Sequence, residues 1–470
     1  MALCMSIRKT ILISTVLLLF AGKVFCVDGL KIEINAPQWG NQRLQLVSYY
    51  NDGRYTQDTL RLSASGTGVF RSDLRYPEGL YMIYLDSVRF FDLLLADDQT
   101  FSVTVDPADF ISGNRVEGSV QTEAFLSYSR FLAGAHRERT GLFNEFNRLK
   151  TEGKNTEEVT ARMDSLNNRV IAFQDTFFET CGDQWVARFF KGLSPAAPGP
   201  YPAPRTMEEA IEESLYRKYH FFDPIDLQDP RFWYTNYFPK KIEQYITGVV
   251  EQIPDSIAKA ASWLVEQAMG DSICGRMMLG KLMNYALSND MMGLENVWAR
   301  LAEDYYFKEL VYTPDSVFLE RLKADYRNIR NNRIGMQGQN LTLQDNTGRE
   351  IQLYDLTGKL TLLYFFEPDC GFCKKTTPRL YEVYMKYKDK GLSVACICTT
   401  NHRKEWLNFI DEQGLSDWYN LWDPEFVSAF WQYYDTSTTP GVYVLDESHR
   451  IIAKKLDVDS LDRLFSMILK

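Results

Sequence analysis

The chain has 470 residues, of which 45% are hydrophobic and 24% charged, a normal balance for globular domains. This length favours about two to four domains over a single core. Its 62 acidic and 52 basic residues give a net charge of −10, which argues against non-specific nucleic-acid binding because such binding needs a basic surface.

The N-terminus has the pattern of an export signal. Two basic residues precede the apolar run 11–20, which is too short to span a bilayer comfortably. We expect residues 1–26 to be a signal peptide and the protein to be exported to the periplasm or cell envelope. Cys26 is the position that a lipidated cysteine would take, although Phe25 fits that motif poorly. An uncleaved signal anchor is the remaining alternative.

Residues 27–118 show the period of β-strands. Apolar and polar residues alternate in runs such as 31–34 and 101–105, and turn signals such as residues 51–53 separate the runs. We expect an all-β, sandwich-like domain or partial barrel here, with packing or partner recognition as its default role.

Residues 119–335 show helical spacing instead. One long helical stretch is expected to run to about residue 191, followed by a proline-rich break at 194–202 and further helices from 207 to about 333. The many aromatic residues of this region are most simply packing residues. Cys181 and Cys274 are either buried thiols or a structural disulfide, and the sequence does not choose between them.

Residues 336–470 predict an α/β domain. The expected order is a hairpin, a buried strand, a helix, a second buried strand, another helix, a second hairpin and a closing helix, at residues 341–353, 360–366, 373–390, 392–398, 404–412, 441–456 and from 460. The helix between the two buried strands can supply the right-handed crossover that parallel strands need. The fold class is therefore multi-domain, with an all-β domain, an α-helical domain and a C-terminal α/β domain of thioredoxin order.

Cys370 and Cys373 stand at the predicted start of a helix. With this spacing the two sulfurs lie on one helical turn and can close a disulfide with little strain. The free backbone N–H groups and the positive end of the helix dipole favour a thiolate at Cys370, so its pKa should be low.

Residues 365–375, with the sequence FFEPDCGFCKK, resemble the active-site stretch of the thioredoxin superfamily, above all of the exported TlpA/ResA-like thiol–disulfide oxidoreductases. Pro378 takes the place of the family's helix-kinking proline, and Thr439-Pro440 resembles its cis-proline segment. The resemblance covers about residues 336–470. The preceding part looks like the N-terminal extension of some large exported TlpA-like proteins, from which no chemistry is transferred.

The resemblance implies a thiol–disulfide oxidoreductase in which Cys370 attacks a disulfide and Cys373 resolves the mixed disulfide. Pro440 would be cis, and the backbone of Thr439 would pair with an extended substrate. It implies no cofactor other than a redox-active Cys370–Cys373 disulfide, and no metal. The implied partners are client proteins with thiols or disulfides and a membrane or periplasmic redox partner, with no nucleic acid.

Three positions depart from the family pattern. Asp369 replaces a Trp, Tyr364 replaces a buried Asp, and Thr376 replaces the Glu of ResA-like proteins. The usual buried acid is thus missing at both of its places, and Glu367 is the nearest candidate for proton transfer. The dipeptide between the cysteines matches neither a reducing nor an oxidising relative, so the redox poise stays open.

The cysteines also allow other interpretations. Cys370, Cys373, Cys396 and Cys398 make a conceivable zinc site, but Cys396 and Cys398 alternate on a strand and are expected to be core residues. Cys398 as a third redox thiol and His402 as a copper ligand are less favoured than a core thiol and an exposed loop residue. A peroxiredoxin would need a Thr three residues before a single reactive Cys, which is absent.

The alternative of another class is a non-enzymatic protein. In that case the long N-terminal part binds a partner or envelope component, and the thioredoxin-like domain is a redox-dependent docking module.

Overall fold

The computed structural model describes residues 29–470 except 107, 111–112 and 196–197. The predicted signal peptide, with Cys26, lies outside the described residues. Across the part of the chain that is described, no helix combines the length and the apolar character needed to cross a bilayer.

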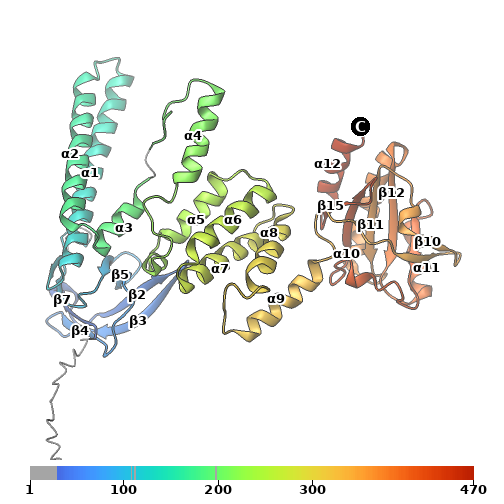
Figure 1. Ribbon diagram of the computed structural model, residues 1–470, viewed down its shortest axis with the longest axis horizontal. Coiled ribbons are helices and arrows are strands. Elements are labelled where there is room, and N and C mark those ends of the chain that lie inside the picture. Colours follow the sequence, from blue (N-terminus) through green and yellow to red (C-terminus); the bar gives the residue numbers. More distant parts are fainter. Residues whose placement is uncertain (1–28, 107, 111–112, 196–197) are drawn as a thin grey trace, which may run out of the picture. The chain divides into compact units, whose positions relative to one another are not determined.

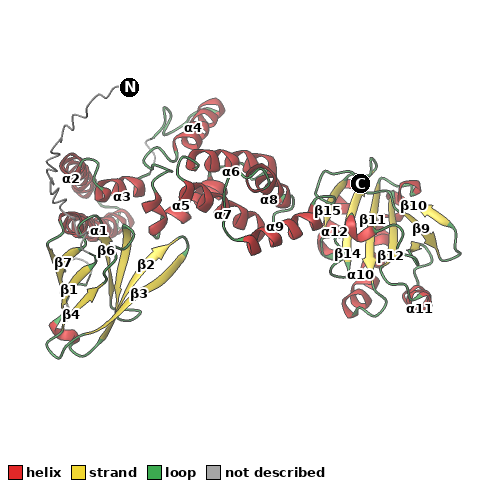
Figure 2. Ribbon diagram, turned by 60° about the horizontal axis from the view of Figure 1, so that its bottom comes forward, coloured by secondary structure: helices red, strands yellow, loops and turns green. Residues whose placement is uncertain are grey.

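The N-terminal part is rich in β-structure, as predicted (Figure 2). Its strands pair into two four-stranded sheets in the orders β4-β1-β7-β8 and β3-β2-β5-β6. The strands are β1 (Lys31–Asn35), β2 (Arg43–Tyr50), β3 (Gly53–Arg61), β4 (Thr67–Arg71), β5 (Gly79–Tyr84), β6 (Phe90–Leu95), β7 (Thr100–Thr104) and β8 (Arg115–Glu117). In β1, Ile32 and Ile34 are buried while their neighbours are more exposed, which is the alternation expected of a sheet with one covered face.

The helical region follows, but its first part is broken where the sequence pattern predicts one long stretch. It consists of α1 (Val120–Thr151), α2 (Glu157–Cys181) and α3 (Trp185–Leu193). Gly153 adopts a φ of +65°, and Lys154 N–H reaches back to Leu149 O at 2.9 Å, which closes the end of α1. The chain then reverses, and α1 and α2 run side by side as an antiparallel pair (Figure 1) around a small core of Leu142, Val159 and Leu166.

Further helices continue the region to Ile329, as predicted. They are α4 (Met207–His220), α5 (Phe238–Gly248), α6 (Pro254–Ala268), α7 (Ser272–Ser288), α8 (Leu294–Leu301) and α9 (Ser316–Ile329). Cys181 and Cys274 are both buried and both free, so they are separate thiols and do not form the alternative disulfide.

The C-terminal part is a thioredoxin-like α/β domain with a seven-stranded sheet in the order β10-β9-β13-β12-β11-β14-β15. Its strands are β9 (Thr342–Asp345), β10 (Glu350–Gln352), β11 (Leu360–Phe366), β12 (Leu392–Cys398), β13 (Tyr419–Trp422), β14 (Gly441–Asp446) and β15 (Ile451–Lys454), and its helices are α10 (Gly371–Tyr387), α11 (Arg403–Gln413) and α12 (Val458–Ile468). The two buried strands lie at the predicted residues. β13 was not predicted, because its four residues are too few to show a period.

Strand β11 is buried on both faces. Leu362 and Tyr364 belong to one core with residues of α10, α11 and α12, whereas Leu363 and Phe365 belong to a second core on the other face. Alternate side chains of a strand point to opposite faces, so a continuous apolar run is what a central strand requires.

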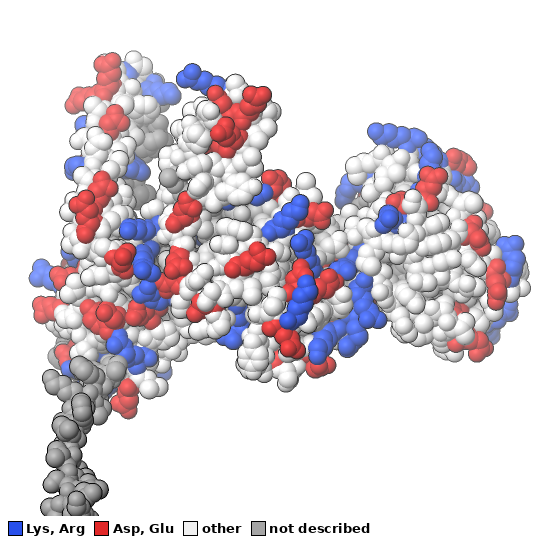
Figure 3. Space-filling view, in the orientation of Figure 1, with Lys and Arg blue, Asp and Glu red and all other residues white. Residues whose placement is uncertain are grey.

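By their internal contacts the described residues form two compact units. One consists of the described residues up to Leu46 with Thr56–Glu78 and Met82–Val170, and the other consists of the remaining described residues to Lys470. The division falls within α2, and short parts of the β region join the second unit. The domain limits 27–118, 119–335 and 336–470 stay a prediction. Acidic and basic side chains are interspersed on the face shown in Figure 3.

Gly153 tests the helix break. We expect Gly153→Ala to destabilise the α1–α2 pair locally by about 1 kcal/mol, because its left-handed conformation is costly with a Cβ. Hydrogen exchange measured by mass spectrometry on the full chain should show faster exchange in both helices.

Gly134→Ala is the matched control. Gly134 lies inside α1 with open space around an added Cβ, and we expect slower exchange there because Ala is the better helix former. Equal effects of the two substitutions would contradict the role given to Gly153.

Candidate active site

Cys370 and Cys373 lie where the central strand of the C-terminal domain meets a helix. Residues 367–369 turn the chain away from β11, and Cys370 is the N-cap of α10, which begins at Gly371. The helix therefore starts slightly before the predicted Cys373. Pro378 lies inside α10, at the place that the sequence comparison expects.

The two cysteines share the first turn of α10, as expected. The backbone N–H of Cys373 donates a hydrogen bond to Cys370 Sγ over 3.2 Å. The Cys370 thiol donates in turn to the carbonyl oxygen of Thr439 over 3.4 Å. The Thr439–Pro440 peptide bond is cis, as the resemblance implies. The fold thus brings together residues far apart in the sequence that the resemblance selects for one site.

The surroundings of the two thiols shift their pKa values in opposite directions. Burial alone would raise the pKa of Cys370, but hydrogen bonds from the Cys373 thiol, from the Thr439 side chain and from backbone N–H groups at the start of α10 lower that pKa below its usual value. Burial, and next the neighbouring Cys370, raises the pKa of Cys373 to about 12. The thiolate therefore forms at Cys370 at a lower pH than at Cys373.

Access to solvent follows the same order. Cys370 is half-buried and Cys373 is fully buried. Phe372, between them, is 75% exposed. A disulfide that approaches from outside meets Cys370 first and can contact an apolar ring beside it.

Glu367, the candidate for proton transfer, is an exposed residue of the turn before α10. Its carbonyl oxygen accepts a hydrogen bond from Cys370 N–H over 3.1 Å. Its carboxylate contributes to a raised pKa of the Cys398 thiol, although burial is the larger cause. The backbone of Glu367 thus shapes the turn, and its role as a proton carrier stays a prediction.

Tyr364 and Thr377 are site residues that the sequence analysis did not assign. Both are fully buried below the first turn of α10. Thr377 Oγ1 donates to the carbonyl oxygen of Cys373 over 2.8 Å, and Tyr364 Oη lies 3.0 Å from Thr377 Oγ1. Because the single hydroxyl hydrogen of Thr377 is used, Tyr364 is the donor in this pair. A chain of two hydroxyl groups therefore holds the backbone of the resolving cysteine.

Tyr364 stands at the sequence position of one missing acid, but the hydroxyl pair that it forms with Thr377 has different chemistry. Burial raises the pKa of Tyr364 far above its usual value, so this phenol stays protonated at neutral pH. Tyr364 can donate a hydrogen bond but cannot accept a proton as a carboxylate does. From the sequence, Tyr364 could be recognised only as a departure from the family pattern. Thr377 could have been found from its position one helical turn after Cys373, where a hydroxyl group can reach the Cys373 carbonyl.

Cys396 and Cys398 are core thiols, as expected. Both point into the core on the face of the sheet that carries Cys373. Burial raises the pKa of each, and the Cys398 thiol contacts Thr400. His402 is exposed at the start of α11. Among residues 29–470 as described, no three or more His, Cys, Asp or Glu side chains are grouped so as to hold a metal ion.

Comparison with known proteins finds relatives of the C-terminal region. Residues 334–454 match the model of the AhpC/TSA family. The C-terminal region therefore contains a thioredoxin-like domain that is similar to this family. A large N-terminal part precedes it.

Curated relatives of the domain carry the name thiol–disulfide oxidoreductase ResA. The protein from Bacillus thuringiensis strain Al Hakam is 34% identical over 82 residues, which are 17% of this chain and 47% of that protein. The protein from Bacillus cereus strain ZK / E33L is 25% identical over 134 residues, 28% of this chain and 74% of that protein. The chain spans about half the length of the first of these relatives.

Solved structures include a domain of a possible thiol–disulfide isomerase from Cytophaga hutchinsonii, 35% identical, with 28% of this chain and 91% of that chain covered and a TM-score of 0.28. A thioredoxin-like protein from Bacteroides caccae is 18% identical over 58% of this chain and 97% of that chain, with a TM-score of 0.44.

The pKa difference predicts unequal thiol reactivity. In the reduced protein at pH 7 we expect Cys370 to be alkylated by iodoacetamide at least about 100-fold faster than Cys373, because the thiolate is the reactive form and its fraction falls tenfold per pKa unit. Peptide mass spectrometry after timed quenching measures both rates in one sample. The Cys370 rate should rise with pH and reach half of its maximum below pH 9, because its pKa is lowered; similar rates for the two thiols would contradict the assignment.

Tyr364→Phe tests the hydroxyl pair in the thioredoxin-like domain. Loss of one buried hydrogen bond should lower the free energy of unfolding by about 1 kcal/mol and slow the attack of Cys373 on a preformed mixed disulfide at Cys370, since the first turn is held less firmly. Stopped-flow release of a thionitrobenzoate leaving group from Cys370 measures the second effect.

Tyr434→Phe is the control for that substitution. Tyr434 is equally buried but lies in the core on the other face of the sheet, and donates to Gln339 O over 2.9 Å. We expect a similar loss of stability without a change in the release rate. If both variants slow the release equally, Tyr364 has no specific positioning role.

Proposed function

We propose that this protein is a thiol–disulfide oxidoreductase of the cell envelope that exchanges disulfides with client proteins through Cys370 and Cys373. The observation that carries the proposal is the asymmetry of the pair, with a half-buried Cys370 of lowered pKa and a buried Cys373 of raised pKa on one helical turn. The ResA relatives of the thioredoxin-like domain support the same chemistry.

In the first step the Cys370 thiolate attacks one sulfur of a client disulfide. A mixed disulfide forms between Cys370 and the client, the client S–S bond breaks, and the second client sulfur leaves as a thiolate. The N–H of Cys373 that donates to Cys370 Sγ stabilises the thiolate before the attack. The backbone of Thr439, beside Cys370 Sγ, can bind the client chain.

In the second step Cys373 loses its proton and attacks Cys370 Sγ. The Cys370–Cys373 disulfide forms, the mixed disulfide breaks, and the remaining client thiolate leaves. The proton that Cys373 loses is taken up by the departing client sulfur as the new disulfide forms, and the first client thiolate takes from water the proton that Cys370 released when it ionised. The client gains two electrons and two protons in total, and the cysteine pair is oxidised.

Turnover in this direction requires a thiol partner that returns two electrons to the pair by the same exchange. A membrane or periplasmic dithiol protein can supply them. The reverse sequence, in which the oxidised pair accepts electrons from client thiols, uses the same atoms. The location in the cell envelope rests on the signal-like sequence at residues 1–26.

Insulin reduction tests the proposal. The full mature chain with dithiothreitol should precipitate insulin faster than dithiothreitol alone, and Cys370→Ser should abolish the gain because the attacking sulfur is lost. Cys373→Ser should accumulate a mixed disulfide with insulin on non-reducing gels, since the resolving thiol is missing. Cys398→Ser, a change of a core thiol in the same domain, should keep most of the activity.

A wild-type protein that reduces insulin no faster than Cys370→Ser would overturn the enzymatic proposal. That outcome, together with a redox-dependent change in partner binding, would favour the docking-module alternative.

A further inference from the structure

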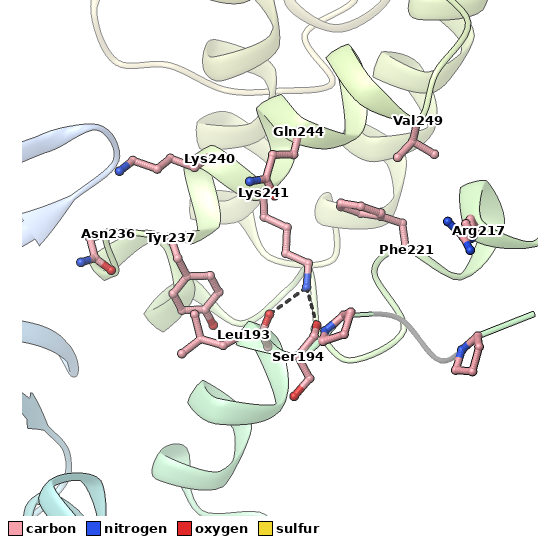
Figure 4. A pocket seen from close by; sticks show the side chains of 13 residues that line it. Leu193, Ser194, Arg217, Phe221, Asn236, Tyr237, Lys240, Lys241, Gln244 and Val249 are labelled. Atoms are coloured by element: carbon pink, nitrogen blue, oxygen red, sulfur yellow. Dashed lines mark hydrogen bonds between the residues drawn. The ribbon is translucent and has the colours of Figure 1, made fainter. Parts of the chain in front are cut away.

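A large cavity lies in the helical region, among residues of α3, α4 and α5 and the segments that connect them (Figure 4). Its volume is about 950 Å³, large enough for a small organic molecule. It lies apart in sequence from the thioredoxin-like domain, and the redox chemistry makes no use of it.

Lys241 of α5 occupies the middle of this cavity. Its side chain extends between Phe221 and Tyr237, and its ammonium group donates to Gly192 O over 2.8 Å and to Ser194 O over 3.0 Å, as the dashed lines in Figure 4 show. Only 9% of Lys241 is exposed. A lysine that is so strongly buried is usually paired with a carboxylate.

No carboxylate neutralises Lys241 within the described part of the chain. Its two hydrogen-bond partners are backbone carbonyls at the end of α3, and an ammonium group has a third hydrogen to donate. Burial lowers the pKa of Lys241, and no acidic group acts against this shift. The cavity therefore contains a desolvated positive charge whose partners are two carbonyl oxygens and the Phe221 ring, with Nζ 5.6 Å from the ring centroid, and one N–H donor is left over.

The rest of the lining is basic and polar. Arg217 lies beyond Phe221 and Lys240 extends to the opposite side of Lys241 in Figure 4. None of the described lining residues is Asp or Glu. The nearest acidic partner of the set is Glu213 behind Arg217, and that carboxylate already binds Arg217 Nε over 2.9 Å and two backbone N–H groups.

Lys240 and Gln244 bring further hydrogen-bond donors. Lys240 is exposed and has no ion-pair partner among the described residues, and Gln244 stands one helical turn after it. Phe221 and Tyr237 supply aromatic surface on the two sides of Lys241. Cationic donors around an aromatic floor suit a molecule with an anionic group and an apolar body.

Capping of α3 accounts for two of the donors of Lys241, because cations are favourable at a helix C-terminus. Capping does not account for the cavity, or for Lys240, a further cation of the lining that has no ion-pair partner among the described residues. We propose that this cavity binds an organic carboxylate, with the anion at the free donor of Lys241 and its apolar part against Phe221 or Tyr237.

Isothermal titration calorimetry on the full mature chain tests this with matched probes. N-acetyl-phenylalanine is a free carboxylic acid, and acetyl-Ala-Ala-Phe offers a peptide C-terminus; the C-terminal amide of each is the uncharged control. We expect each acid to bind at least about tenfold more tightly than its amide, with dissociation constants of about 1 mM or lower. Tighter binding of the tripeptide identifies a peptide terminus, and equal binding identifies a free acid.

Variants place the binding in the cavity. Lys240→Gln should weaken the acids severalfold, whereas Lys259→Gln, an exposed lysine of α6 outside the cavity, should not. Lys241→Met should abolish binding. If that variant does not fold, hydrogen exchange of the wild type must show protection by the acid within residues 236–249.

Equal affinity for acid and amide, no saturation by either acid at about 10 mM, or acid-induced protection only outside residues 236–249 would each overturn the proposal. The thiol–disulfide chemistry at Cys370 is tested separately by insulin reduction.

Discussion

The hydrogen bond from the backbone N–H of Cys373 to Cys370 Sγ is the interaction on which the redox site depends. It exists because Cys370 is the N-cap of α10, so its sulfur takes the place that a capping oxygen usually has. The same short turn that ends β11 and begins α10 therefore lowers the pKa of one thiol and buries the other. Hydrogen bonds from the Cys373 and Thr439 side chains and from the backbone lower one pKa, and burial raises the other, with no charged side chain among the main causes.

The core below the cysteines contains hydrogen-bonded hydroxyl groups where related proteins are expected to have a buried carboxylate. A buried carboxylate there could take the proton of Cys373, whereas Tyr364 and Thr377 together hold the Cys373 carbonyl and stay neutral. Cys396 and Cys398 add only protonated thiols to this core. In the proposed reaction the proton of Cys373 leaves with the client sulfur or through the exposed side of the turn, where Glu367 lies.

The helical region shows a different use of charge. In the thioredoxin-like domain the buried side chains near the cysteines are neutral. In the helical region a buried lysine, Lys241, donates hydrogen bonds to backbone carbonyls at the C-terminal end of α3. Buried charge is costly unless it is paired, so a helix end that relies on Lys241 leaves a positive potential in the adjoining cavity. The two parts of the chain thus differ: no buried charge lies beside the cysteine pair, whereas the cavity of the helical region contains the buried charge of Lys241.

Much of the C-terminal domain could be predicted from the sequence, because a strand buried on both faces must be a continuous apolar run and residues 360–366 and 392–398 are such runs. The cysteine pair, the turn before it and the proline segment at 440 are also local patterns. Tertiary structure alone decided the rest. The contact of Thr439 with Cys370 joins residues 69 positions apart, and the Lys241 contacts depend on how α5 packs against the end of α3. A sequence period reports which face of an element is buried, but it does not report which polar atoms meet once that face is covered.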